Sequence, residues 1–215
     1  MGKKRAEYRC VTTSVEGFVQ QVAVQYLRHG YWFYVAGKIP EGKDPTVVDA
    51  KLIKRYGIDV SRWERARRKR AGLANMQYIR QDRFFLLMAT HGLHWFFEDE
   101  AGQIRDARRV PIRFAGYSLS FRGGHSSVRI QQALFGQLKH SMMVSAPHAS
   151  SESLIRSVQR LRFEPYAPIR QQLRSLIRAI NRARSQAGLA TLPLAPFPWK
   201  RRPVRPFDSL SSNHT

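Results

Sequence analysis

The sequence has a single cysteine, Cys10, among its 215 residues. One cysteine allows neither an intrachain disulfide nor a thiolate zinc cluster, and it fits a reducing compartment such as the cytoplasm. Long apolar runs are also missing, because the longest stretch, 84–89, is far shorter than a membrane span. No apolar signal core follows the basic residues 1–9. We therefore expect a cytoplasmic protein, nucleoid-associated or bound in a nucleoprotein, with no membrane partner.

Acidic residues are scarce as well. The chain has 15 Asp and Glu against 37 Lys and Arg, which gives a net charge of +22 and a pI near 11.2. Self-repulsion on this scale opposes folding unless a polyanion offsets it, and nucleic acid presents closely spaced phosphates that cations can neutralise. Most of the cations are arginines, which form bidentate pairs with phosphates and base edges. The charge balance predicts nucleic-acid binding.

The hydrophobic fraction of 43% is sufficient for a core, and its periodicity indicates an α+β fold. We predict a central, mainly antiparallel sheet with packed helices. The helices are predicted over 13–29, with Thr13 as N-cap, and over 45–56, 62–70, 131–142, 151–163 and 169–187. The strands are predicted over 31–35, 76–79, 84–89, 94–98, 110–121 and 126–130, with turns at Ala101-Gly102 and Gly123-Gly124.

The domain organisation predicted from these elements is one α+β nucleic-acid-binding domain over residues 1–188. It contains a basic, helix-turn-helix-like insert over 44–72 and an Arg-rich helical part over 131–188. Residues 189–215 are rich in proline and are predicted to form an extended basic tail. The tail contributes four candidate phosphate contacts: Lys200, Arg201, Arg202 and Arg205.

The pair of helices on either side of Gly57 resembles a helix-turn-helix over about twenty residues. Apolar residues flank the glycine on both sides, although Ile53 replaces the small residue that is usual there. The resemblance implies a second helix in a groove or along phosphates. The cations of this helix are Arg62, Arg65, Arg67, Arg68, Lys69 and Arg70. The alternative is a basic surface helix that buries Trp63 and Ala66 against a sheet.

A second cationic row occupies the last predicted helix. Arg170, Arg174, Arg178 and Arg182 recur every fourth residue beside an apolar face. Like charges at this spacing repel one another, and a polyanion would relieve the repulsion. The alternative is a solvated helix face.

The predicted strands of the middle region carry aromatic and cationic residues that a single strand of nucleic acid could contact. These residues are Tyr117, Phe121, Arg122 and Arg129. For the aromatic residues we favour packing in the core, whereas Arg122 and Arg129 remain candidate nucleic-acid contacts.

The one indication of catalysis is the pair His91 and His94. The order of elements around it resembles the HUH-type replication and REP-associated transposase families over about 140 residues. That resemblance implies a divalent metal, Mg²⁺ or Mn²⁺, held by His91, His94 and Glu98, with Tyr166 or Tyr117 attacking a phosphate. The two histidines are three residues apart rather than two, which puts them on opposite faces of a regular strand. The alternative is two ordinary histidines at a strand end.

We therefore expect a protein that grips the phosphate backbone through Arg-rich helices, with DNA favoured over RNA. A role in the replication or transposition of a mobile element is the leading expectation, and a protein partner in a nucleoprotein complex is possible. Two alternatives stay open: an HUH-like metal-dependent single-strand DNA nuclease, and a non-catalytic RNA-binding component of a ribonucleoprotein. No cofactor is expected other than the metal of the nuclease alternative.

Overall fold

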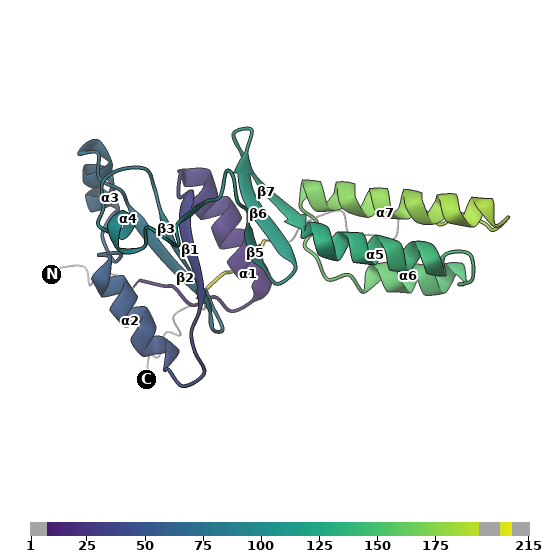
Figure 1. Ribbon diagram of the computed structural model, residues 1–215, viewed down its shortest axis with the longest axis horizontal. Helices are drawn as coiled ribbons and strands as arrows, with labels where there is room; N and C mark the ends of the chain where they lie inside the picture. The colour runs from purple at the N-terminus through teal and green to yellow at the C-terminus, as the bar shows by residue number, and fades with distance from the viewer. Residues whose placement is uncertain (1–7, 194–202, 208–215) are drawn as a thin grey trace, which may run out of the picture. The chain divides into compact units, whose positions relative to one another are not determined.

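The structure is a computed structural model that describes residues 8–193 and 203–207. Over these residues the fold is α+β, with seven α-helices and two antiparallel sheets of four and three strands (Figure 1). The chain forms two compact units. The first takes in the described residues of Met1–Ile112, Leu119–Ser126 and Val204–Thr215, and the second takes in those of Arg113–Ser118 and Ser127–Pro203.

The four-stranded sheet is the centre of the first unit. Its strands are β1 (Phe33–Lys38), β2 (Met76–Gln81), β3 (Phe84–Ala89) and β4 (Arg105–Asp106), in the order β2-β3-β1-β4. The predicted pairing of the second and third strands is confirmed, with Tyr78 opposite Leu87. β1 pairs with the other side of β3, with Val35 opposite Leu87. The strand β3 is therefore central, which agrees with its uninterrupted apolar sequence.

One face of this sheet is covered by the first helical segment. It begins as α1 (Val15–Gln20), continues as a π-helix (Gln21–Tyr26) and a 3-10 turn (Leu27–His29), and ends at Gly30 with φ of 92°. The predicted extent is thus confirmed, but the N-cap is Ser14, whose hydroxyl accepts the N–H of Gly17, and not Thr13. Thr13 instead donates its N–H to the carbonyl of Pro206.

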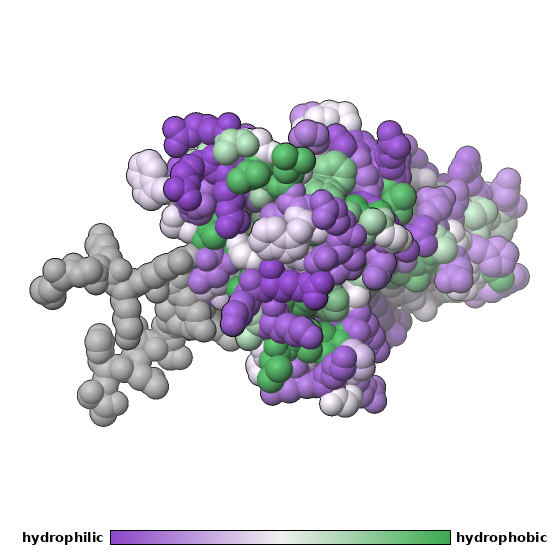
Figure 2. Space-filling view, turned by 60° about the vertical axis from the view of Figure 1, so that its left-hand side comes forward, coloured by the Kyte–Doolittle hydropathy of each residue, from purple (hydrophilic) through white to green (hydrophobic). Residues whose placement is uncertain are grey.

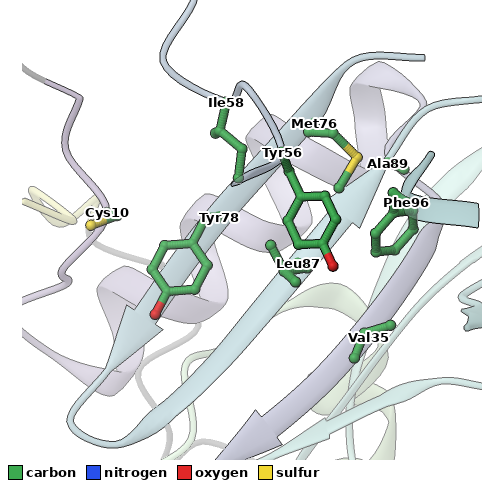
Figure 3. Packing of buried hydrophobic residues seen from close by; sticks show 9 residues of the cluster. All are labelled: Cys10, Val35, Tyr56, Ile58, Met76, Tyr78, Leu87, Ala89 and Phe96. Carbon is green, nitrogen blue, oxygen red and sulfur yellow. The ribbon is translucent and has the colours of Figure 1, made fainter. Parts of the chain in front are cut away.

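The other face is covered by α2 (Pro45–Arg55) and α4 (Phe96–Asp99), and α3 (Arg62–Arg70), which has no buried residue, lies on the same side of the sheet. Figure 1 shows them gathered on one side of the sheet, with α1 on the other. Tyr56, Ile58 and Phe96 are fully buried here against strand residues such as Met76 and Leu87, as Figure 3 shows. Side chains alternate along β3, so that the ring of Phe84 points to the opposite face and contacts Phe18 at 5.8 Å.

A buried ion pair ties α2 to β2. Asp49 and Arg80 are 6% and 7% exposed, and the Arg80 guanidinium donates to both carboxylate oxygens of Asp49 at 2.8–3.0 Å. The hydroxyl of Tyr78 also donates to Asp49, at 2.5 Å. This cluster removes one arginine from the surface.

Two predicted strands are wrong in part. Residues 94–98 lie mainly in α4, because the chain turns at Gly92 after β3 and the N–H of Phe96 at the start of the helix bonds to the ring of His94. Residues 110–121 contain two strands, since the chain turns at Ala115-Gly116, where both residues have positive φ.

The three-stranded sheet consists of β5 (Ile112–Phe114), β6 (Tyr117–Arg122) and β7 (His125–Ile130) in sequence order. The predicted turn at Gly123-Gly124 is confirmed. The two glycines have φ of 57° and 79°, as a type I′ hairpin turn requires.

The helices of the second unit are α5 (Gln132–Ser145), α6 (Ser151–Gln159) and α7 (Ala167–Gln186), which lie along one another (Figure 1). α6 ends four residues earlier than predicted. The predicted apolar face of α7 is confirmed. Its members are all buried: Ile169, Leu173, Leu176, Ile177 and Ile180.

Candidate nucleic-acid interface

The helix α3 has no buried residue. Its nine residues carry six basic side chains and one acidic one. Ser61 caps the helix by accepting the N–H of Glu64, and backbone bonds attach its C-terminal end, where Leu73 donates to the carbonyl of Arg68. One side of the helix meets the unit, where Glu64, Arg65 and Arg68 are half-buried and the side chain of Asn75 donates to the carbonyl of Arg65 at 3.0 Å. The other side faces solvent.

The charge of α3 is only slightly compensated. Glu64 accepts from Arg67 at 2.9 Å and lies 3.4 Å from the Nε of Arg68. Arg68 also donates to the carbonyl of Gly57 at 3.1 Å. Within the described part of the chain, no acidic partner accompanies Arg62, Lys69 or Arg70. A strongly positive surface results.

The apolar packing expected of a helix-turn-helix is absent from α3. The first half of the motif is as predicted, because Gly57 has φ of 54° and Tyr56 and Ile58 are buried. On α3, however, Trp63 is 83% exposed and Ala66 is exposed too. Both the recognition-helix packing and its alternative, in which Trp63 and Ala66 are buried against a sheet, are therefore wrong.

Replacing Trp63 with Ala should change the free energy of unfolding by no more than about 0.5 kcal/mol, because the ring makes little contact with the protein. Urea unfolding followed by circular dichroism would measure this. As a control, Phe96→Ala removes a fully buried ring and should cost about 3–5 kcal/mol. A loss above about 2 kcal/mol in Trp63→Ala would show that the ring packs against the fold.

A groove of about 620 Å³ lies beside the C-terminal end of α3. Figure 2 shows this side of the unit, where hydrophobic residues lie between strongly hydrophilic ones. Leu93 is 76% exposed and Trp95 is 49% exposed, and large apolar side chains that are exposed together are typical of binding surfaces. The groove is lined by Arg68, Leu73, Ala74, Gly92, Leu93, His94, Trp95, Phe97 and Glu98. The sequence analysis did not predict this groove, although Trp95 follows directly after His94, which it had considered as a metal ligand.

His94 forms part of the wall of this groove. Its Nδ1 accepts the N–H of Phe96 at 3.0 Å, and its ring stacks on Trp95 with 4.1 Å between centroids. Burial lowers the pKa of His94, so the imidazole is neutral at pH 7. The ring therefore acts as a fixed, uncharged support for Trp95.

The predicted metal ligands do not form a cluster. After β3 the chain turns at Gly92, whose φ is 133°, and a Cβ there would lie 2.6 Å from the backbone of Leu73 and Ala74. His91 and Glu98 are exposed and His94 is bonded to the backbone. In residues 8–193 and 203–207 no three His, Cys, Asp or Glu side chains are placed to hold a metal ion. The strand on which the HUH resemblance placed these ligands is absent.

The two candidate nucleophilic tyrosines belong to the second unit. Tyr117 is 1% exposed, its hydroxyl accepts the N–H of Glu164 at 2.9 Å, and its ring contacts Phe163. Tyr117 is therefore a core residue, which fits the preference for core packing. Tyr166 is half-buried at the N-cap of α7.

The arginines of α7 differ in exposure. Arg174, Arg178 and Arg182 are exposed, whereas Arg170 is half-buried and donates to the carbonyl of Pro165. Arg178 and Arg182 line a hollow of about 790 Å³ on the polar face of this helix. The row is thus a second cationic surface with three exposed members.

The remaining candidate cations are dispersed. Arg122 and Arg129 are exposed, and they donate weakly, to the carbonyl of Arg109 at 3.4 Å and the hydroxyl of Ser127 at 3.5 Å. Arg205 is exposed, in a short segment that Gln20 holds through two hydrogen bonds with Val204. Lys200, Arg201 and Arg202 lie outside the described residues.

No protein-family model, curated protein or solved structure matches this chain. Among the described helices, none combines the length and the apolar character that crossing a membrane requires. The chemistry of the surfaces themselves must therefore indicate the function.

Proposed function

We propose that this protein binds nucleic acid through its phosphate backbone, with α3 as the main contact surface. The observation that carries the proposal is that a helix with six basic residues and one acid has no buried side chain. No apolar side chain of α3 is buried, so the helix gains little stability from hydrophobic packing. Its exposure and charge are explained if a polyanion covers it.

The chemistry of α3 favours phosphates over isolated carboxylates. Five of the six cations are arginines, whose planar guanidinium groups pair with phosphate through two parallel hydrogen bonds. Regularly spaced phosphates can neutralise several of them at once and release counterions. The exposed arginines of α7 supply a second surface of the same kind, and Arg122 and Arg129 supply further single contacts.

We favour DNA as the nucleic acid, in the replication or transposition of a mobile element. This narrower proposal comes from the sequence, and RNA within a ribonucleoprotein is its alternative. Competition between duplex DNA and folded RNA at matched salt would decide between the two.

The test is a salt series of binding measurements on the full chain and two triple variants. The first variant, Arg67→Gln, Lys69→Gln and Arg70→Gln, removes three exposed cations of α3. Its slope of log K against log salt on duplex DNA should be shallower by up to about 2.7, or about 0.9 per lost phosphate contact. The control, Arg156→Gln, Arg160→Gln and Arg162→Gln, removes the same charge from exposed positions outside the candidate surfaces.

The control should shift the slope far less than the α3 variant. If both triples weaken binding equally, affinity follows net charge and α3 is not the contact surface. If the wild-type chain binds neither duplex nor single-stranded nucleic acid at low salt, the proposed function is wrong.

A further inference from the structure

The groove beside α3 differs in chemistry from the helix next to it. Apart from one cation, Arg68, and one acid, Glu98, its lining is apolar, aromatic or the uncharged His94. Arg68 is already engaged by the Gly57 carbonyl and by Glu64. The groove therefore has no net positive charge, and the Glu98 carboxylate opposes the entry of a phosphate.

The groove nevertheless adjoins the cationic helix. Arg68 belongs to both, and the next lining residue, Leu73, bonds to its carbonyl. A bridge between Leu73 and Leu93 joins the chain after α3 to the segment that carries Trp95. A polymer whose charged backbone follows α3 would hence bring uncharged groups to the mouth of this groove.

We propose that the groove receives an unstacked base of a single-stranded nucleic acid whose phosphates lie along α3. The inference rests on the proposed function and specifies its substrate. Trp95 is half exposed and is supported by His94, which makes it a suitable platform for stacking a base. The volume of about 620 Å³ lies within the range of small-ligand sites, roughly 300–1,000 Å³.

The lining of the groove also suits a base better than it suits an apolar side chain of a protein partner. Bases combine a flat aromatic face with N–H groups that donate hydrogen bonds, the ring N3–H in thymine and amino groups in the other bases, and Glu98 supplies a carboxylate acceptor at the groove. The charge of α3 complements a nucleic-acid backbone. One single-stranded nucleic acid therefore accounts both for the exposure of Leu93 and Trp95 in the groove and for the charge of α3.

The experiment compares binding of the full chain to oligothymidylate and to an abasic strand with the same number of phosphates. We expect the wild-type protein to bind the base-containing strand about 5- to 150-fold more tightly, as one stacked base provides. Trp95→Leu should bring this ratio close to one and leave the affinity for the abasic strand unchanged. The α3 triple variant should weaken binding to both strands and preserve the ratio.

A fluorescence measurement keeps the test valid if Trp95→Leu folds poorly. With Trp63 and Trp199 replaced by Phe, the remaining tryptophans are Trp95 and Trp32, whose ring contacts Phe121 and Arg108. Quenching by oligothymidylate and not by the abasic strand would support a base on Trp95.

Equal affinity for the two strands, or a ratio that Trp95→Leu leaves unchanged, would overturn the groove proposal. If the abasic strand still binds and still depends on α3, the proposed function survives that result. Failure to bind either strand would overturn the groove proposal, and it would overturn the proposed function as well only if duplex DNA were not bound either.

Discussion

Asp49→Ala should lower the free energy of unfolding of the first unit by about 3–5 kcal/mol, because it leaves the buried guanidinium of Arg80 without its counter-charge. Arg80 donates to both carboxylate oxygens of Asp49, and neither side chain reaches solvent appreciably. The substitution also removes the acceptor of the Tyr78 hydroxyl. Burial and the neighbouring Asp49 raise the pKa of Tyr78 well above its usual range, so that hydroxyl remains a proton donor at all physiological pH values.

Urea unfolding followed by tryptophan fluorescence measures this loss, because Trp32 and Trp95 belong to the first unit. Asp99→Ala is the matched control. Asp99 accepts from Arg55 at 2.8 Å, but the two side chains are 31% and 51% exposed, and a pair that solvent reaches in this way contributes about 0–1 kcal/mol. Equal losses in the two variants would show that the cluster of Asp49, Tyr78 and Arg80 adds nothing beyond an exposed pair.

Local signals in the sequence predicted much of the secondary structure. The helix over 62–70 was predicted at both ends, because Ser61 caps it and Gly72 follows it. The pairing of 76–79 with 84–89 also followed from short apolar runs separated by polar residues. Each of these signals lies within a few residues of the helix end or hairpin that it determines.

The prediction that failed around His94 depended on tertiary context. An aromatic run such as residues 94–97 is equally compatible with a strand or a buried turn of helix. The Gly92 turn and the bond from the Phe96 N–H to His94 decide the matter. The groove could not be predicted from the sequence for the same reason. Leu73 and Leu93, which both line it, are far apart in the sequence and are brought together by a β-bridge in the folded chain.

Composition could not separate arginines that serve the fold from those that face solvent. Arg80 and Arg184 count toward the net charge, yet both are buried and bonded to protein groups. For Arg184 a signal was present. It lies four residues after Ile180 and seven after Ile177, which places it on the buried stripe of α7 and not in the row of Arg174, Arg178 and Arg182.

Arg184 joins three segments of the second unit. Its guanidinium donates to the carbonyls of Ala146, Ala149 and Ala190 and to the hydroxyl of Ser151. These acceptors include the carbonyl of Ala146, the C-cap residue of α5, which has no partner within that helix. One side chain therefore satisfies acceptors after α5, at the start of α6 and after α7.

Arg184→Ala should consequently destabilise the second unit by at least about 3 kcal/mol, since several charge-assisted hydrogen bonds disappear and their acceptors stay partly buried. Arg182→Ala, two residues earlier on the same helix, removes an exposed charge and should change stability by less than about 0.5 kcal/mol. Urea unfolding followed by circular dichroism at the helical band compares them.

The same two variants separate stability from binding. At temperatures where both are folded, Arg182→Ala should weaken nucleic-acid binding, because α7 loses an exposed cation. Arg184→Ala should bind like the wild-type chain, because its charge is enclosed by carbonyl groups and unavailable to phosphate. Equal weakening in both would mean that α7 contributes only to the overall charge, and the cationic row would then be a solvated face of the helix.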